Sequence, residues 1–475
     1  MPKIAMIGAG SIVFSKTLIM DILATDALRD STFALMDLDE GKLRRAEGFT
    51  QRVIGDNGLP AQVDATTERQ EALRDADYVV VMLQIGGIGA FGVDYEVPLK
   101  YGVDQCIGDT LGPGGVFRAL RTIPVLVDIA LDMEELCPNA LFMNYANPMA
   151  PCCWALGEES SVQFVGLCHG VQTTLDLISR YVDVPKEEID HFCAGINHMA
   201  WFLALERDGE DLYPRLRENI EKPEYYVNEK VRCEVMRHFG YFMTESTGHL
   251  SEYVPWFRKS QKALDLYCDE PDFGGASGAY YEWCKTVADK YEGQDVLARE
   301  STDLPARSAE YCGWIVEAME TDNTFRLNGN VRNDGLITNL PDGCCVEVPC
   351  YVDRTGLHPI VVGDLPPQCA ALNQSNVTTQ GLSVEAALTG DPELAFHAIA
   401  MDPLTSAVLT LAEAREMTAE MLEASRQWLP HFEGRTLRPT PHIGTPEDIE
   451  RVDVPTDPAL VIANRFIELI EGAPE

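Results

Sequence analysis

Two short stretches of the chain carry side chains that could do chemistry together. Cys168 and His169 follow the apolar residues FVGL, and His198 follows the similar stretch CAGIN thirty residues after the cysteine. A metal site, a nucleophilic thiol and simple packing are the three explanations, because a free cysteine is often only a small buried hydrophobe. Adjacent residues of an extended segment point to opposite faces, which disfavours a Cys168–His169 nucleophile pair, although a corner into a following helix weakens this objection.

The position of these residues favours the metal. Asn147, Cys168 and His198 each come at the carboxyl end of an apolar run, and ligands of an open α/β sheet bind at that edge. A thiolate and an imidazole with open coordination positions suit a divalent transition metal that acts as a Lewis acid. A closed structural zinc site needs four protein ligands, and the usual spacings are missing. We therefore predict that Cys168 and His198 are metal ligands.

The elements that must position these residues alternate between strands and helices. Apolar runs typical of strands, at residues 3–7, 31–37, 61–67 and 75–87, are separated by helical patterns. This alternation predicts an α/β fold with an N-terminal Rossmann-like domain over residues 1–198, a doubly wound parallel sheet like that of lactate and malate dehydrogenases. Long helices and a β-rich stretch follow, which predict a C-terminal α+β domain for substrate binding and oligomerisation over residues 199–475.

The first strand leads into IGAGSIVF, an incomplete dinucleotide fingerprint. Gly8 and Gly10 match its first two glycines, but Val13 stands where the third is expected, and a tight turn alone would also explain the motif. We predict that a helix begins at Ser11 and holds a pyrophosphate with its amide groups. Asp37 ends the next strand, where a carboxylate accepts hydrogen bonds from ribose hydroxyls and repels a 2′-phosphate, so the prediction is NAD rather than NADP.

The charge of the chain limits its partners. The 475 residues include 75 acidic and 37 basic ones, only 11 of the latter are lysines, and the net charge is −38. Such a surface repels nucleic acids and anionic membranes. It indicates either high solubility alone or adaptation to high salt, which screens the self-repulsion.

The chain shows no signal-peptide pattern and no run of 18 apolar residues, the length that would suggest a membrane span. Its 14 cysteines are scattered through the sequence. Without a secretory signal, these thiols are expected to be reduced, which predicts a cytoplasmic enzyme.

Taken together, several motifs resemble glycoside hydrolase family four, and most closely the bacterial α-galactosidases of the melibiase type. The resemblance extends from about residue 2 to about residue 430. The motifs occur in this order: IGAGS, ALMDLD, DADYVVV, QIGG, DTLGPGGVFRALRTIP, NYANPMA, VGLCHGVQ, CAGINHMAW, ESTGHLSEYVPWF and GNVRNDGLITNLPDGCCVEV.

The resemblance implies an NAD- and manganese-dependent glycosidase that does not use the usual pair of carboxylates. Its members oxidise C3 of the sugar transiently, remove the proton at C2 and expel the leaving group from C1 by elimination. Water then adds, and the hydride returns to C3.

The resemblance also implies roles for individual residues. Cys168 and His198 correspond to the metal ligands, and Asn147 to a residue that contacts the substrate. Tyr253 corresponds to the base, although packing against neighbouring aromatic rings would also explain it. His169 stands where many relatives have an acidic proton donor, and an imidazolium can donate a proton near neutral pH.

Asp109 and Arg118 flank the glycine-rich stretch GDTLGPGG. They could line the sugar pocket, or they could cap the loop and the helix that follows. We predict that they bind the substrate, a small glycoside.

Other functions fit parts of the sequence. An α-glucosidase or an α-galacturonidase of the same family would share the scaffold. An NAD-dependent dehydrogenase, or a regulatory protein that binds the cofactor without catalysis, would need only the N-terminal half. The family resemblance further implies a homodimer or a homotetramer.

Overall fold

The computed structural model describes residues 1–11, 14–291, 296–455 and 457–471. Residues 1–437 form one compact unit, and residues 438–475 form a second one, which contains the helix α19 (Pro458–Glu471). No helix among the described residues combines the length and the apolar character needed to cross a membrane. The domain boundary predicted at residue 198 lies within the first unit and stays a prediction.

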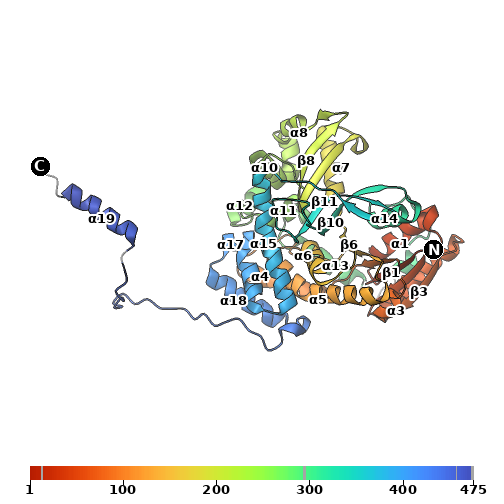
Figure 1. The fold of residues 1–475 in the computed structure, drawn as a ribbon, viewed down its shortest axis with the longest axis horizontal. Coiled ribbons are helices and arrows are strands. Elements are labelled where there is room, and N and C mark those ends of the chain that lie inside the picture. Colours follow the sequence, from red (N-terminus) through yellow and green to blue (C-terminus); the bar gives the residue numbers. More distant parts are fainter. Residues whose placement is uncertain (12–13, 292–295, 456, 472–475) are drawn as a thin grey trace. The chain divides into compact units, whose positions relative to one another are not determined.

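One sheet runs through the first unit (Figure 1). Its strand order is β3-β2-β1-β4-β5-β6-β10-β11-β7-β8-β9, and β12 pairs with β11. The strands are β1 (Lys3–Ile7), β2 (Thr32–Met36), β3 (Gln62–Thr66), β4 (Tyr78–Val81), β5 (Leu141–Asn144), β6 (Phe164–Gly166), β7 (Asp190–Ile196), β8 (Met199–Arg207), β9 (Glu210–Asp211), β10 (Phe325–Arg332), β11 (Cys345–Asp353) and β12 (Gly356–Pro359).

Helices surround this sheet. They are α1 (Phe14–Ala24), α2 (Glu40–Asp56), α3 (Arg69–Leu73), α4 (Gly87–Lys100), α5 (Gly112–Leu136), α6 (Met149–Glu159), α7 (Gly170–Val182), α8 (Tyr213–Ile220), α9 (Pro223–Tyr226), α10 (Lys230–Phe239), α11 (Thr247–Tyr253), α12 (Gln261–Tyr267), α13 (Ala279–Tyr291), α14 (Tyr311–Thr321), α15 (Pro367–Thr389), α16 (Pro392–Met401), α17 (Pro403–Val408) and α18 (Leu411–Ala424).

The strands from β3 to β6 pair in parallel, in the strand order typical of dinucleotide-binding sheets. Helices cover both faces: α1 and α2 pack on the face that carries Ile4 and Met6, and α5 packs on the face that carries Ala5 and Ile7. Two covered faces explain why β4 and β5 are apolar at nearly every position. The predicted Rossmann-like sheet is confirmed.

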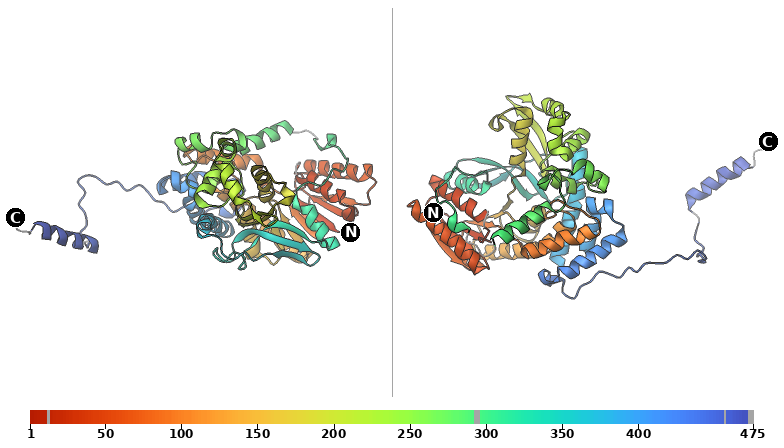
Figure 2. Two further views of the ribbon diagram at one scale, coloured as in Figure 1. Left: turned by 90° about the horizontal axis from the view of Figure 1, so that it is seen from above. Right: turned by 180° about the vertical axis from the view of Figure 1, so that it is seen from behind.

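The second half of the sheet is antiparallel. The β10–β11 hairpin joins β6 through the pair Asn330–Gly166, and β11 pairs with β7 through Glu347 and Gly195. β7 and β8 form a further hairpin, which with α7 and α8 makes a separate lobe at the top of Figures 1 and 2 (right). Strands β6 and β7, which carry the two predicted metal ligands at their ends, are therefore separated in the sheet by two strands that come much later in the chain.

Candidate active site

Cys168 and His198 meet at the junction of the two halves of the sheet. Cys168 lies two residues beyond β6, and His198 lies in the two-residue loop between β7 and β8. The distance from Cys168 Sγ to His198 Nε2 is 3.3 Å. His198 has a left-handed backbone with φ of 62°. Such conformations cost about 1–3 kcal/mol each and cluster at functional sites. The predicted pair of metal ligands therefore lies close together.

Glu245 and His249 complete a larger cluster. Glu245 Oε2 lies 3.3 Å from His198 Nε2 and 3.5 Å from His249 Nδ1. Glu245 also has a left-handed backbone, with φ of 85°. One ligand atom from each of His198, Glu245 and His249 lies within 4.8 Å of the others. With Cys168 beside them, the donor set of sulfur, nitrogen and oxygen fits a divalent transition metal.

Burial and charge set the protonation of this cluster. Burial lowers the pKa of His198 to about 4, which keeps the ring neutral as a metal ligand must be. Burial would also favour a neutral His249, but the Glu245 carboxylate outweighs it and raises the pKa of His249 to about 9. Glu245 keeps its charge in spite of burial because the two histidine rings lower its pKa. Burial raises the pKa of the Cys168 thiol, whereas a coordinated thiol is deprotonated.

The Tyr253 hydroxyl connects the cluster to Thr110, which lies two residues before α5. It lies 3.2 Å from His198 Nδ1 and 2.8 Å from Thr110 Oγ1, and Thr110 Oγ1 lies 2.7 Å from His249 Nε2. Tyr253 is 2% exposed, and burial raises its pKa well above the usual value. The side chain thus points into the site rather than merely packing among its aromatic neighbours, and its hydroxyl has polar partners on two sides.

Two glycines bring Thr110 and Asp109 to this position. A Cβ atom on Gly114 would lie 2.4 Å from the Gly108 carbonyl oxygen, and one on Gly115 would lie 2.5 Å from the Thr110 carbonyl carbon. No side chain fits in either space, so the first turn of α5 can pack against the loop that carries Asp109 and Thr110. The described helix begins at Gly112, so these glycines lie within it.

Asn147, Asp109 and Arg118 form a second polar group. The Asn147 side-chain amide donates a hydrogen bond to Asp109 Oδ2 at 3.1 Å, and Arg118 Nη1 lies 3.3 Å from the same oxygen. The N–H groups at Arg118 Nε and Nη1 are buried without a hydrogen-bond partner. Buried donors of this kind are costly unless a ligand satisfies them. The structure therefore brings the three predicted substrate residues together.

His169 is paired with a residue outside these groups. Its side chain is 51% exposed, and its Nδ1 lies 3.3 Å from Glu310 Oε1, just before α14. The hydrogen bond to Glu310 raises the pKa of His169. A carboxylate partner thus favours the imidazolium form that a proton donor needs.

The turn after β1, where the sequence predicts the dinucleotide, is held mainly by backbone groups. The Gly10 N–H donates to Asp37 Oδ2, and the Asp39 N–H donates to Asp37 Oδ1, each at 2.9 Å. Gly8 has φ of 84°, and a Cβ atom there would lie 2.7 Å from the Met82 carbonyl oxygen. The prediction that a helix begins at Ser11 is wrong: the Ser11 N–H closes a turn onto the Gly8 carbonyl, and the described helix begins at Phe14. Val13 lies outside the described residues.

Sequence reasoning missed Thr110, Glu245, His249 and Glu310. Helical spacing could have revealed one of them. His249 and Tyr253 lie four residues apart on α11, so their side chains are neighbours on one side. Glu245 lies two residues before α11 and has a left-handed backbone, so helical spacing does not place it. Thr110 and Glu310 gave no comparable signal, because only the tertiary fold brings them to the site.

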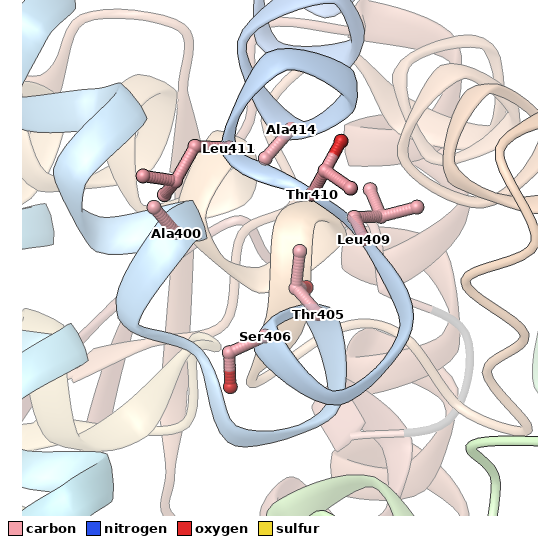
Figure 3. Close-up of a pocket in the computed structure, with 7 residues that line it drawn as sticks. All are labelled: Ala400, Thr405, Ser406, Leu409, Thr410, Leu411 and Ala414. Carbon is pink, nitrogen blue, oxygen red and sulfur yellow. The ribbon is translucent and has the colours of Figure 1, made fainter. Parts of the chain in front are cut away.

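A surface hollow of about 310 Å³ lies among α16, α17 and α18 (Figure 3). Short side chains such as Thr405, Leu409 and Ala414 line it. None of the predicted site residues lies there, and its lining contains no titratable group.

The Rossmann-like sheet, with a buried cluster of sulfur, nitrogen and oxygen atoms beyond the ends of β6 and β7, defines the class of this protein as an α/β protein with a dinucleotide-binding type of sheet. Residues 3–184 match the sequence model of the family 4 glycosyl hydrolases, and residues 193–405 match that of their C-terminal domain. The chain belongs to this family, which confirms the resemblance and the prediction of a glycoside hydrolase.

Several curated relatives resemble most of the chain. An α-galactosidase of Rhizobium meliloti is 41% identical over 90% of this chain and 89% of its own length. An α-galactosidase of Bacillus subtilis is 40% identical over 91% of this chain and 100% of its own length. An α-glucosidase of Erwinia rhapontici is 28% identical over 90% of this chain and 98% of its own length.

Solved structures share the fold. The Bacillus subtilis protein LplD is 27% identical, with a TM-score of 0.79 over 89% of this chain and 99% of its own. The 6-phospho-β-glucosidase of Thermotoga maritima, solved with manganese, NAD+ and glucose-6-phosphate, is 24% identical, with a TM-score of 0.73 over 90% of this chain and 98% of its own.

Proposed function

We propose that this protein hydrolyses α-galactosides with the help of NAD and manganese, by transient oxidation at C3, deprotonation at C2 and elimination. The observation that carries the proposal is the Tyr253 hydroxyl beside the Cys168–His198 cluster. The names of the two relatives at about 40% identity support the galactoside. An α-glucosidase or α-galacturonidase activity is the alternative.

The residues present fit both cofactors. Cys168 and His198 would hold the metal, with Glu245 within reach of the same ion. Gly8, Gly10 and Asp37 would hold the dinucleotide, because the two glycines leave the turn after β1 without side chains and the carboxylate follows β2. When bound, NAD supplies a hydride acceptor for C3, and the metal supplies a Lewis acid for the C3 oxygen.

The proton transfers fall to the side chains. Tyr253 would remove the C2 proton as a phenolate. A bound metal and the neighbouring His249 imidazolium would have to offset the burial that raises its pKa. Its hydrogen-bond partner Thr110 fixes the direction of its hydroxyl. His169 would donate a proton to the leaving group, since Glu310 favours its imidazolium form. Asn147, Asp109 and Arg118 would bind the sugar hydroxyls.

The ion pairs of three arginines favour a neutral sugar over a uronic acid as the substrate. Asp109 offsets the charge of Arg118, which leaves N–H donors suited to hydroxyl groups. Arg258 is engaged by Asp104 and by the Gly275 carbonyl, and Arg332 is paired with Asp334. A galacturonate would need a cation for its C6 carboxylate, and Arg118, Arg258 and Arg332 each already have an acidic partner.

Hydrolysis in deuterium oxide tests the mechanism. The galactose product should carry deuterium at C2, because the elimination breaks the C2–H bond and water supplies the new proton. Full retention of protium at C2, read by proton NMR, would contradict it. A panel of nitrophenyl α-galactoside, α-glucoside and α-galacturonide tests the sugar, and a dehydrogenase would instead accumulate NADH.

We also propose a cytoplasmic homodimer or homotetramer. All 14 cysteines are free, which suits a reducing compartment. Light scattering coupled to size-exclusion chromatography checks the oligomer, and a mass equal to one chain would contradict it.

A further inference from the structure

Glu252 is a buried carboxylate that the proposed chemistry does not use, although it directly precedes the proposed base Tyr253. Its side chain belongs to a residue that is 1% exposed. Its Oε1 accepts hydrogen bonds from the Cys106 N–H at 2.7 Å and the Ile107 N–H at 2.6 Å, and its Oε2 accepts one from the Gly108 N–H at 3.1 Å. Successive N–H groups thus converge on one carboxylate, as in the backbone nests that bind anions.

A side-chain amide strengthens the same attachment. Gln105 Nε2 donates to Glu252 Oε2 at 3.1 Å and to the Leu111 carbonyl at 3.0 Å. Gly108 has a left-handed backbone with φ of 68°, which glycine adopts without strain. The loop between Gln105 and Leu111 is therefore tied to Glu252 and is also closed on itself.

Arg258 supplies the opposite charge beside this carboxylate. Burial would lower the pKa of Arg258, and the charges of Asp104 and then of Glu252 raise it. Arg258 Nε also donates to the Asp104 carbonyl at 2.8 Å, directly before the loop. Buried charges persist in proteins when they are paired and hydrogen-bonded, as these are.

The loop that Glu252 holds presents two of the proposed active-site residues. Asp109 and Thr110 come directly after the three N–H donors, and Thr110 Oγ1 lies 2.8 Å from the Tyr253 hydroxyl and 2.7 Å from His249 Nε2. Glu252 itself belongs to α11, the helix that carries His249 and Tyr253. One carboxylate therefore joins the helix of the proposed base to the loop that orients its hydroxyl.

The two neighbours on α11 point to different groups. Adjacent residues of a helix do not face each other. The Tyr253 hydroxyl contacts His198 and Thr110, whereas the hydrogen bonds of Glu252 go to residues 105–108. Glu252 can therefore act on Tyr253 only through the loop.

We infer that Glu252 is a positioning residue for the proposed reaction, which holds the loop so that Thr110 directs the Tyr253 hydroxyl. The inference rests on the proposed glycosidase function and adds to it a residue that touches neither the sugar nor the cofactors. A glutamine cannot replace this carboxylate, because its amide group would turn N–H donors toward the N–H donors of the loop.

A double-mutant cycle tests the inference. Glu252→Gln should lower kcat about 100-fold, the effect of misplacing a reacting group by about 1 Å. Binding of NAD and manganese should stay near wild-type values, because their proposed ligands lie outside the loop. Thr110→Val removes the hydroxyl through which Glu252 acts and should also lower kcat. Because both changes disturb the same orientation of Tyr253, the double variant should be little slower than the slower single variant.

Gln105→Leu is a second variant, which removes one donor from the loop instead of the carboxylate. It should show the same pattern with Thr110→Val but a smaller loss of kcat. If Glu252→Gln does not fold, the cycle of Gln105→Leu with Thr110→Val decides by the same criterion.

Asp21→Asn is the matched control, because Asp21 is also a buried carboxylate, 2% exposed, which accepts hydrogen bonds from the Ser308 N–H and hydroxyl. Its effect on kcat should be small and should multiply with that of Thr110→Val. A wild type without glycosidase activity overturns the proposed function and this inference with it. An active wild type overturns the inference alone if the folded loop variant has a normal kcat, or if its effect multiplies with that of Thr110→Val.

Discussion

The polar groups around Gly10 come from one continuous part of the chain. Those of the cluster around His198 come from four separate segments. The proposed dinucleotide site uses the turn after β1 and the carboxylate after β2, within residues 8–39. The cluster uses Thr110, Cys168, His198 and the segment 245–253. The first site is therefore a local property of one βαβ unit, and the second depends on the packing of the whole first unit.

The largest effect should come from the cluster. Cys168→Ser and His198→Ala should each abolish hydrolysis and manganese binding without unfolding the protein, because each removes a ligand that no neighbour can replace in the same geometry. Manganese content after dialysis, circular dichroism and a chelator titration measure this. His358→Ala, at an exposed histidine on β12, is the control. Full manganese binding in either variant would contradict the ligand assignment.

Tyr253→Phe should separate catalysis from assembly. It removes the proposed base but leaves the metal ligands in place, so kcat should fall about 10²–10⁴-fold, the usual contribution of a general base. Manganese and NAD binding should stay near wild-type values in calorimetric titrations. Tyr351→Phe, at the surface, should have no effect. A Tyr253→Phe variant that turns over normally would remove the tyrosine from the mechanism.

A change at the local site should be smaller. Asp37→Ala should weaken NAD binding about 10–100-fold, as expected for loss of hydrogen bonds to a charged group at about 1.5–3 kcal/mol. Manganese binding should not change. Fluorescence titration with NAD and NADP measures both affinities, with Asp64→Asn on β3 as the control. Tighter binding of NADP than of NAD by the wild type would overturn the cofactor assignment.

Low pH should also destabilise the hairpin of β7 and β8, through a histidine that lies outside the proposed active site. Burial and then the charge of Arg326 lower the pKa of His191 to about 4. The unfolded chain binds this proton below about pH 6.5, so stability is full above that pH and falls as the pH drops toward 4. After a discount for partial exposure, the loss is about 2 kcal/mol. Denaturant titrations of the wild type and His191→Gln measure it, and equal pH slopes would contradict it.

Added salt should stabilise the whole protein and should not distinguish the two sites. Because the net charge is −38, added potassium chloride screens self-repulsion, and the melting temperature should rise toward molar salt. The relative activities of the variants should not change. A flat or falling melting temperature would mean that the charge serves solubility alone.

The sequence predicts the two sites to different extents, because the site around Gly10 is local and the cluster around His198 is not. Gly8, Gly10 and Asp37 could be placed because strand, turn and strand are encoded in one short stretch. Asn147 and Cys168 could also be placed at the edge of the parallel sheet, because each comes shortly after a strand that the sequence predicts. His198 meets Cys168 by another route, since β7 is not a neighbour of β6 and reaches it across β10 and β11. No local pattern contains that insertion, nor the left-handed backbone of Glu245.

The strand order also determines when each site can exist during synthesis. Ribosomes release the chain from its N-terminus, and early segments fold before later ones arrive. The strands around the nucleotide turn are complete by residue 81 and can pair at once. Cys168 and His198 are both synthesised by residue 198, yet the strands between them end at Asp353. A nascent or truncated chain is thus expected to acquire a nucleotide fold well before it acquires a working catalytic centre.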